Sequence, residues 1–164
     1  MESYLNIQLD KPFDFLKKLQ DELMANQQLG EGGAESTVDQ SLASTPATFI
    51  ISFDGKKFFY LEDFSFFFGY QINAFEQSEN TGDQTEIVSF SGDKMLVRKD
   101  EIRFLTKEHD EYILTESSLA LYFSKLMNML KCIASFLEHK GLYSEDLSDF
   151  EHRLTTIIDR LPTY

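Results

Sequence analysis

The sequence has few of the residues that mark secreted, metal-binding or membrane proteins. Its 164 residues include one cysteine, three prolines and no tryptophan. With Cys132 as the single thiol, an internal disulfide framework and a multi-cysteine zinc site are excluded, and a reducing compartment is expected. No apolar run approaches the roughly 18 residues of a membrane span. The N-terminus also lacks the basic and apolar regions of a secretory signal. We therefore expect a cytoplasmic protein that does not bind a membrane.

Basic residues are also scarce. Against 28 acidic residues there are 15 lysines and arginines, which gives a formal charge of −13. Because the negative electrostatic field of such a charge repels phosphate backbones, we expect no direct binding of nucleic acid. Residues 1–84 carry 14 acids and 5 bases (−9), whereas residues 85–164 carry 14 and 10 (−4). A partner with a basic surface would be drawn to the first half, although acidity can also serve only to keep the protein soluble.

The length and hydrophobic content predict a single domain over residues 1–164. Hydrophobic residues make up 42% of the chain, and 16 of them are phenylalanine. A domain of this size buries about two-thirds of the surface that its unfolded chain exposes. We therefore expect a sizeable core built on phenylalanine and leucine.

The N-terminal part predicts a short strand, a helix and a linker. Alternation over residues 5–9 indicates the strand. Asp10 and Pro12 then form a helix start, and the stripe Phe13, Leu16, Leu19, Leu23 continues to Gly30. Residues 30–47 have no hydrophobic period and few large apolar groups, so they predict a flexible acidic linker.

The middle of the chain predicts strands. Asp54-Gly55 lies between two β-rich runs over residues 48–61, which is the sequence of a tight hairpin. The Phe-rich run 64–75 alternates apolar and polar positions, which favours a central strand; a helix beginning at Asp63 is the competing interpretation. Residues 85–97 and 102–115 predict two further hairpins.

The C-terminal part predicts two antiparallel helices. The first follows residues 115–118 and carries a broad apolar stripe that ends at Gly141. The second begins at Ser144 and ends before Pro162. Met127 and Cys132 fall in the apolar zone of the first helix, so both are expected in the core.

Together these elements predict an α+β fold. It consists of an antiparallel meander sheet or partly closed barrel of about seven strands, an N-terminal helix and a C-terminal antiparallel helical hairpin. The strand count and the final helix resemble the topology of pleckstrin-homology barrels, without a shared motif and without the tryptophan of that family's last helix.

Catalytic and metal-binding patterns are not found, so we expect neither an enzyme nor a cofactor. A phosphate-binding loop requires a strand before it and a lysine after it. Gly-Glu-Gly-Gly at residues 30–33 has neither. Glu145, Asp149 and His152 share one helical face and could offer metal ligands, but a solvated acidic face explains them more simply. We therefore predict no metal site.

The remaining features predict protein recognition. Aromatic sheet faces and amphipathic C-terminal helices suit a non-enzymatic binding module, such as a chaperone, an adaptor or an inhibitor of another protein. The alternatives are an acidic mimic of nucleic acid and a carrier of small apolar ligands with a pocket between sheet and helices. The apolar surplus also predicts a homodimer. The candidate partner-binding residues are Phe58, Tyr60, Phe67, Tyr70, Met127, Phe150 and Leu154.

Overall fold

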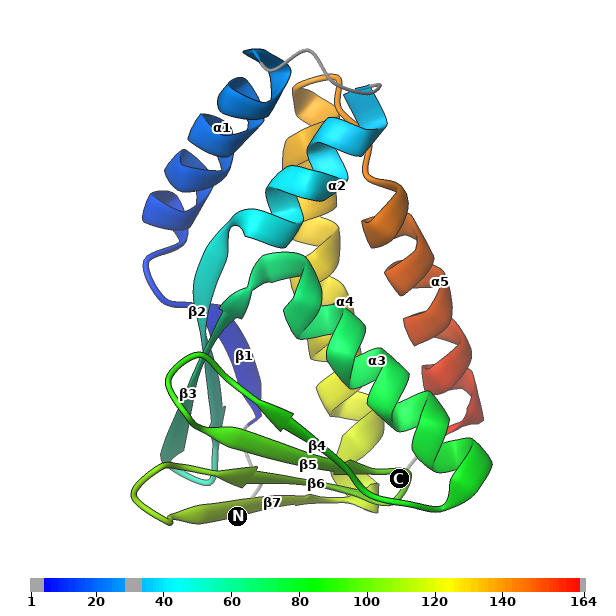
Figure 1. The fold of residues 1–164 in the computed structure, drawn as a ribbon. Helices are drawn as coiled ribbons and strands as arrows, with labels where there is room; N and C mark the ends of the chain where they lie inside the picture. The colour runs from blue at the N-terminus through cyan, green and yellow to red at the C-terminus, as the bar shows by residue number, and fades with distance from the viewer. Residues whose placement is uncertain (1–4, 29–33, 163–164) are drawn as a thin grey trace.

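The computed structural model describes residues 5–28 and 34–162 (Figure 1). These residues form five helices and seven strands, which confirms the α+β class, the N-terminal helix and the C-terminal helical pair. In chain order the elements are β1 (Asn6–Leu9), α1 (Pro12–Gln28), α2 (Ala34–Ser44), β2 (Pro46–Phe53), β3 (Lys56–Asp63), α3 (Phe64–Thr81), β4 (Thr85–Val88), β5 (Lys94–Arg98), β6 (Glu101–Leu105), β7 (Glu111–Thr115), α4 (Glu116–His139) and α5 (Glu145–Arg160).

The strands lie in two separate antiparallel sheets. One sheet has the order β1-β2-β3 and the other β4-β5-β6-β7. The seven predicted strands are thus divided between two sheets instead of forming one meander sheet or partly closed barrel, the fold is not a closed barrel, and the resemblance to the pleckstrin-homology topology does not hold. The physical reason is α3, which carries the chain away from the end of β3, so that the later strands pair only with one another (Figure 1).

The Phe-rich run is helical, so the predicted central strand over residues 64–75 is wrong. In α3 the buried phenylalanines Phe64, Phe67, Phe68 and Phe75 recur at the spacings of one helical face. Phe66, which alternation would place beside Phe64 and Phe68, is 38% exposed. Because the run is apolar at most positions, it satisfies both periods, and packing against the first sheet selects the helix.

The predicted linker over residues 30–47 is also wrong where the structure describes it. Residues 34–44 form α2, on which Val38 and Leu42 are buried, and β2 begins at Pro46. Asn26 on α1 donates to the Ser41 hydroxyl (2.7 Å), and the Ser144 hydroxyl donates to Asp39 (2.6 Å). Two large apolar residues one turn apart are therefore enough to hold this short helix among its neighbours. Residues 30–33 of the linker lie outside the described residues.

The predicted hairpin at Asp54-Gly55 is confirmed. Both residues have positive φ angles, 53° and 74°, and Phe53 pairs with Lys56 across the turn. β1 pairs with β2 on the other side, with Ile7 opposite Ile51. The inner face of this sheet is buried against α3, where the rings of Phe49 and Phe67 stack with centroids 3.6 Å apart.

The C-terminal helices α4 and α5 lie side by side, as predicted (Figure 1). The Ser144 hydroxyl caps α5 by accepting from the N–H of Leu147 (3.0 Å). Cys132 is a correction, since its side chain is exposed rather than in the core. It lies on the outer side of α4 beside the buried Met129 and Ile133. None of the helices formed by the described residues is long and apolar enough to cross a membrane.

Candidate binding groove

Most of the predicted partner-binding residues lie inside the protein. Phe58, Tyr60, Phe67 and Leu154 are at most 1% exposed, and Met127 is 8% exposed. Phe150 is half-buried, with its ring 3.2 Å from the position that a Cβ on Gly69 would take. Of the seven candidates, only Tyr70 has an exposed side chain, at 43%. The predicted aromatic sheet surface is therefore core, because α3 and α4 cover the inner face of the first sheet.

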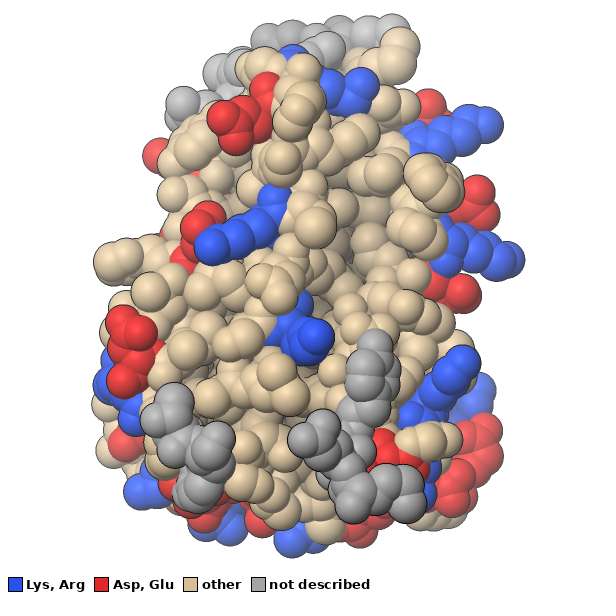
Figure 2. Space-filling model, turned by 180° about the vertical axis from the view of Figure 1, so that it is seen from behind, with Lys and Arg blue, Asp and Glu red and all other residues tan. Residues whose placement is uncertain are grey.

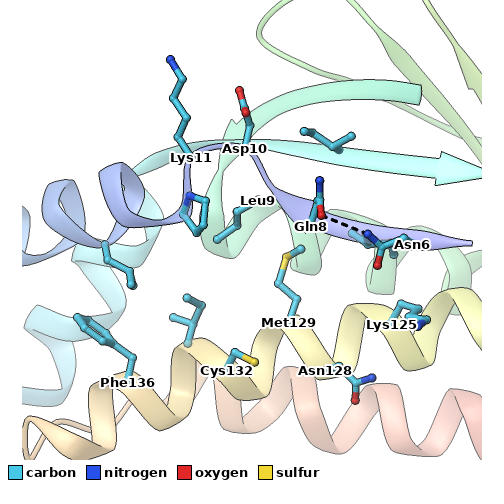
Figure 3. A pocket seen from close by; sticks show the side chains of 15 residues that line it. Asn6, Gln8, Leu9, Asp10, Lys11, Lys125, Asn128, Met129, Cys132 and Phe136 are labelled. Carbon is cyan, nitrogen blue, oxygen red and sulfur yellow. Dashed lines mark hydrogen bonds between the residues drawn. The ribbon is translucent and has the colours of Figure 1, made fainter. Parts of the chain in front are cut away.

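A groove of about 690 Å³ lies along β1, the start of α1 and one side of α4 (Figure 3). We call it the β1–α4 groove. Its lining residues come from β1 and the start of α1, from one position of β2, and from α4, which lies more than 100 positions after the first segment: Asn6, Ile7, Gln8, Leu9, Asp10, Lys11, Pro12, Leu16, Ile50, Lys125, Asn128, Met129, Cys132, Ile133 and Phe136.

The contribution of α4 to the groove is one helical face. The six α4 residues from Lys125 to Phe136 that line it are separated by three, one, three, one and three positions. Figure 3 shows Met129 projecting from α4 toward β1, with Cys132 about one turn further along the helix. This face offers a thioether, a thiol and an aromatic ring to anything that lies in the groove.

The contribution of β1 is of a different kind. All four residues of β1 line the groove, and so does Asp10 after them, although neighbouring side chains of a strand point to opposite faces. The groove must therefore follow the edge of the strand. β1 is an edge strand, because it pairs only with β2 in its sheet. An open strand edge carries backbone donors and acceptors that can pair with another chain.

The groove has an apolar centre and two lysines in its lining. Leu9 and Met129 lie between the levels of Lys11 and Lys125 along the groove, Phe136 lies beyond Lys11, and the Lys11 side chain points away from α4 (Figure 3). Neither lysine is within ion-pairing distance of a carboxylate among the described residues. The one carboxylate in the lining is that of Asp10. The groove thus has a small positive charge in a protein whose net charge is −13.

The surface around α4 is poor in charge as well. Between Glu116 and Glu138, this helix carries Lys125 and Lys131 and no acidic residue. Figure 2 shows the molecule from behind, and there charged side chains gather toward the margins while most of the middle is uncharged. A partner that approaches α4 therefore meets little of the acidic surplus.

A smaller groove repeats the arrangement of an edge strand beside a helix. It has a volume of about 320 Å³ and lies along β4, an edge strand of the second sheet, and one face of α3. Tyr70, Asn73, Ala74 and Gln77 line it from the helix, so the one exposed candidate of the sequence analysis belongs to this site. It contains no cation, and Glu86 is its one charged residue.

Tyr122, Gln71 and the carbonyl of Phe67 form a chain of hydrogen bonds in the interior. The buried Tyr122 hydroxyl donates to Gln71 Oε1, and Gln71 donates to the carbonyl of Phe67 (2.9 Å). Burial raises the pKa of Tyr122 well above its ordinary value, so the phenol stays protonated. The described residues contain no group of three histidine, cysteine or acidic side chains that could hold a metal ion, and this includes Glu145, Asp149 and His152.

The sequence alone does not predict the β1–α4 groove. Each side of the groove comes from a segment whose sequence pattern indicates something else. The alternation of residues 5–9 indicates a strand, and the apolar zone around Cys132 indicates core. A usable signal does exist in α4, where the outward positions 125, 128 and 132 carry lysine, asparagine and cysteine instead of the acids that are common elsewhere. The position of β1 beside that face is a tertiary property.

No protein family, curated protein or solved structure matches the chain in the comparisons. Function is therefore inferred from the geometry of the chain itself.

Proposed function

We propose that the protein is a non-enzymatic protein-binding module that holds a segment of a partner protein in the β1–α4 groove. A chaperone, an adaptor or an inhibitor would all work in this way. The observation that carries the proposal is the open edge of β1 beside the apolar face of α4, within one groove of about 690 Å³. Aromatic and methionine side chains in a groove supply adaptable apolar contact area for a partner.

The exposed residues in the groove allow a test that leaves the core intact. Cys132→Arg places a long charged side chain in the groove, and Ser135→Arg makes the same change at an exposed α4 position outside the lining. Arginine is a good helix former, so both variants should keep the fold, which thermal unfolding would check. We expect a partner captured from native lysate by the wild type to lose at least tenfold in recovery with Cys132→Arg and to be unchanged with Ser135→Arg.

The single cysteine provides a second measurement on the same complex. Because Cys132 is the one thiol of the chain and is exposed in the groove, its alkylation rate reports whether the groove is occupied. We expect the captured partner to slow alkylation. If the partner leaves the alkylation rate unchanged and is recovered equally by all three proteins, it binds elsewhere and the proposal is wrong.

A carrier of small apolar ligands is the second candidate function. The volume of the groove lies within the range of roughly 300 to 1,000 Å³ typical of small-ligand sites. An environment-sensitive apolar dye should then bind the wild type and bind the Cys132→Arg variant more weakly. A groove that takes up no dye would remove this alternative.

The homodimer stays a prediction, and so does the acidic mimic of nucleic acid. Two copies would bring two charges of −13 together, so self-association should strengthen as salt screens the repulsion. Sedimentation velocity at low and high salt measures this. A monomer at every concentration would end the homodimer hypothesis.

A further inference from the structure

We propose that the partner segment binds by strand addition: an extended, alternately apolar segment pairs with the open edge of β1 and places acidic residues near Lys11 and Lys125. This inference rests on the proposed function and specifies how the same groove recognises its partner.

The hydrogen-bond pattern of the sheet shows which backbone groups of β1 are open. The N–H of Asp10 donates to the carbonyl of Thr48 (2.8 Å). In an antiparallel pair the residues alternate in direction, so Asn6, Gln8 and Asp10 bond toward β2. The N–H and C=O groups of Ile7 and Leu9 then point away from β2. No described strand lies on that side, and no other described backbone group bonds to them.

The pairing between β2 and β3 supports this assignment independently. The N–H of Phe64 donates to the carbonyl of Thr45 (3.0 Å), which continues the β2–β3 register by one residue. By alternation the odd-numbered residues of β2 bond to β3 and the even-numbered residues bond to β1. Both observations therefore agree that Ile7 and Leu9 present the free edge.

The dimensions of the groove suit a short extended segment. β1 and the following Asp10 span about 13 Å at roughly 3.3 Å per residue. The α4 residues 125–136 span about 16 Å at 1.5 Å per residue. Four or five extended residues fill that length. Alternate side chains of such a segment would lie over Met129, Ile133 and Phe136, and the others would point to solvent.

The charges of Lys11 and Lys125 determine which residues the groove prefers at the ends of the segment. Lys11 and Lys125 line the groove on either side of Leu9 and Met129, and neither has a described carboxylate partner within 4.0 Å. An acidic residue at either end of the segment would supply one. Because the protein as a whole is acidic, unspecific attraction does not explain a preference for acidic segments. A preference for acidic segments would therefore be due to these two lysines.

A second copy of the chain is a poorer occupant. Paired strands lie about 4.8 Å apart, whereas packed helices need 8 to 10 Å between their axes. In edge-to-edge pairing of two β1 strands, each copy would bring an α4 that packs on its own β1, so both helices would have to fit beside the same pair of strands. The groove lysines of the two copies would also face each other. A free segment of another protein meets neither obstacle.

The first experiment selects peptides of about nine residues from a random display library with the full-length protein as bait. We expect enriched sequences with apolar residues at alternate positions and acidic residues near the ends. The matched bait is the double variant Lys11→Glu and Lys125→Glu, both at side chains that are not in the core. It should bind the enriched peptides roughly tenfold more weakly and enrich basic ends instead. Enrichment of helical patterns, or equal binding to both baits, overturns the inference.

The second experiment separates strand addition from simple apolar contact. N-methylation of alternate residues removes the backbone donors along one edge of an enriched peptide and leaves its side chains in place. We expect one N-methylated series to lose binding and the other, methylated on the opposite edge, to retain it. If both series bind and protect Cys132 from alkylation, the groove still binds a protein segment, but strand addition is wrong. If no peptide is enriched, strand addition is wrong, while the capture experiment with Cys132→Arg still decides the proposed function.

Discussion

Replacing Phe66 and Phe68 separately with alanine tests the helical assignment of the Phe-rich run. The two residues are chemically identical and two positions apart, so a strand would place them on one face and predict equal costs. In α3 they face different surroundings. Phe68 is fully buried and contacts the rings of Phe64 and Phe67 at centroid distances of 5.0 and 5.4 Å. Phe66 is 38% exposed and stacks on Tyr70 at 5.3 Å.

The expected costs follow from this difference. Truncation of a buried phenylalanine to alanine costs about 3 to 5 kcal/mol, from lost burial and the cavity that remains. Phe66→Ala removes a partly exposed side chain, at a site open to solvent that leaves no closed cavity, and one ring contact worth about 0.5 to 1.5 kcal/mol beyond burial. In a protein of this length each kcal/mol lowers the melting temperature by about 2 to 4 °C. Phe68→Ala should therefore melt about 6 to 20 °C below the wild type, and Phe66→Ala only a few degrees below it.

Urea unfolding followed by far-UV circular dichroism measures both variants. The midpoints should separate while the dependence on urea concentration stays the same, which shows that only stability has changed. Equal destabilisation by the two substitutions would refute the helical assignment and restore the strand.

Two further predictions concern the first hairpin. Gly55 has φ 74°, and a Cβ added to it would meet no other atom within 4 Å, so Gly55→Val should cost about 1 to 3 kcal/mol through backbone strain alone. Gly55→Asn, which tolerates positive φ, should recover most of that loss in the same urea assay. Glu62 is 3% exposed, and burial raises the pKa of its carboxyl above the ordinary 4.5; the hydrogen bond from the Asp63 N–H opposes this rise, and the charge of Asp63 adds to it. Because the unfolded chain ionises first as the pH rises, the charged carboxyl costs stability above its folded pKa and nothing below 4.5. Glu62→Gln should therefore be more stable than the wild type at neutral pH, and the difference should vanish at about pH 4; a difference that is the same at both pH values would show that ionisation is not its cause.

Local chemistry is sufficient to predict several elements of this protein. Asp54-Gly55 specifies its hairpin because a two-residue turn needs positive φ angles that few residue pairs supply. Asp10 and Pro12 mark the start of α1, and Ser144 caps α5 with its own hydroxyl. Each of these signals acts within a few residues, so it operates wherever the segment lies in the fold.

Tertiary packing decided the rest. Residues 64–75 are apolar at so many positions that both a strand and a helix can bury them, and the first sheet selects the helix by accepting Phe64, Phe67 and Phe68 together. Residues 34–44 become a helix because Val38 and Leu42 find a place among α1, α3 and α5. The β1–α4 groove exists only because an edge strand from the start of the chain lies beside a helix from its end. No local sequence pattern predicts that β1 and α4 lie close together, because their positions depend on how the whole core packs.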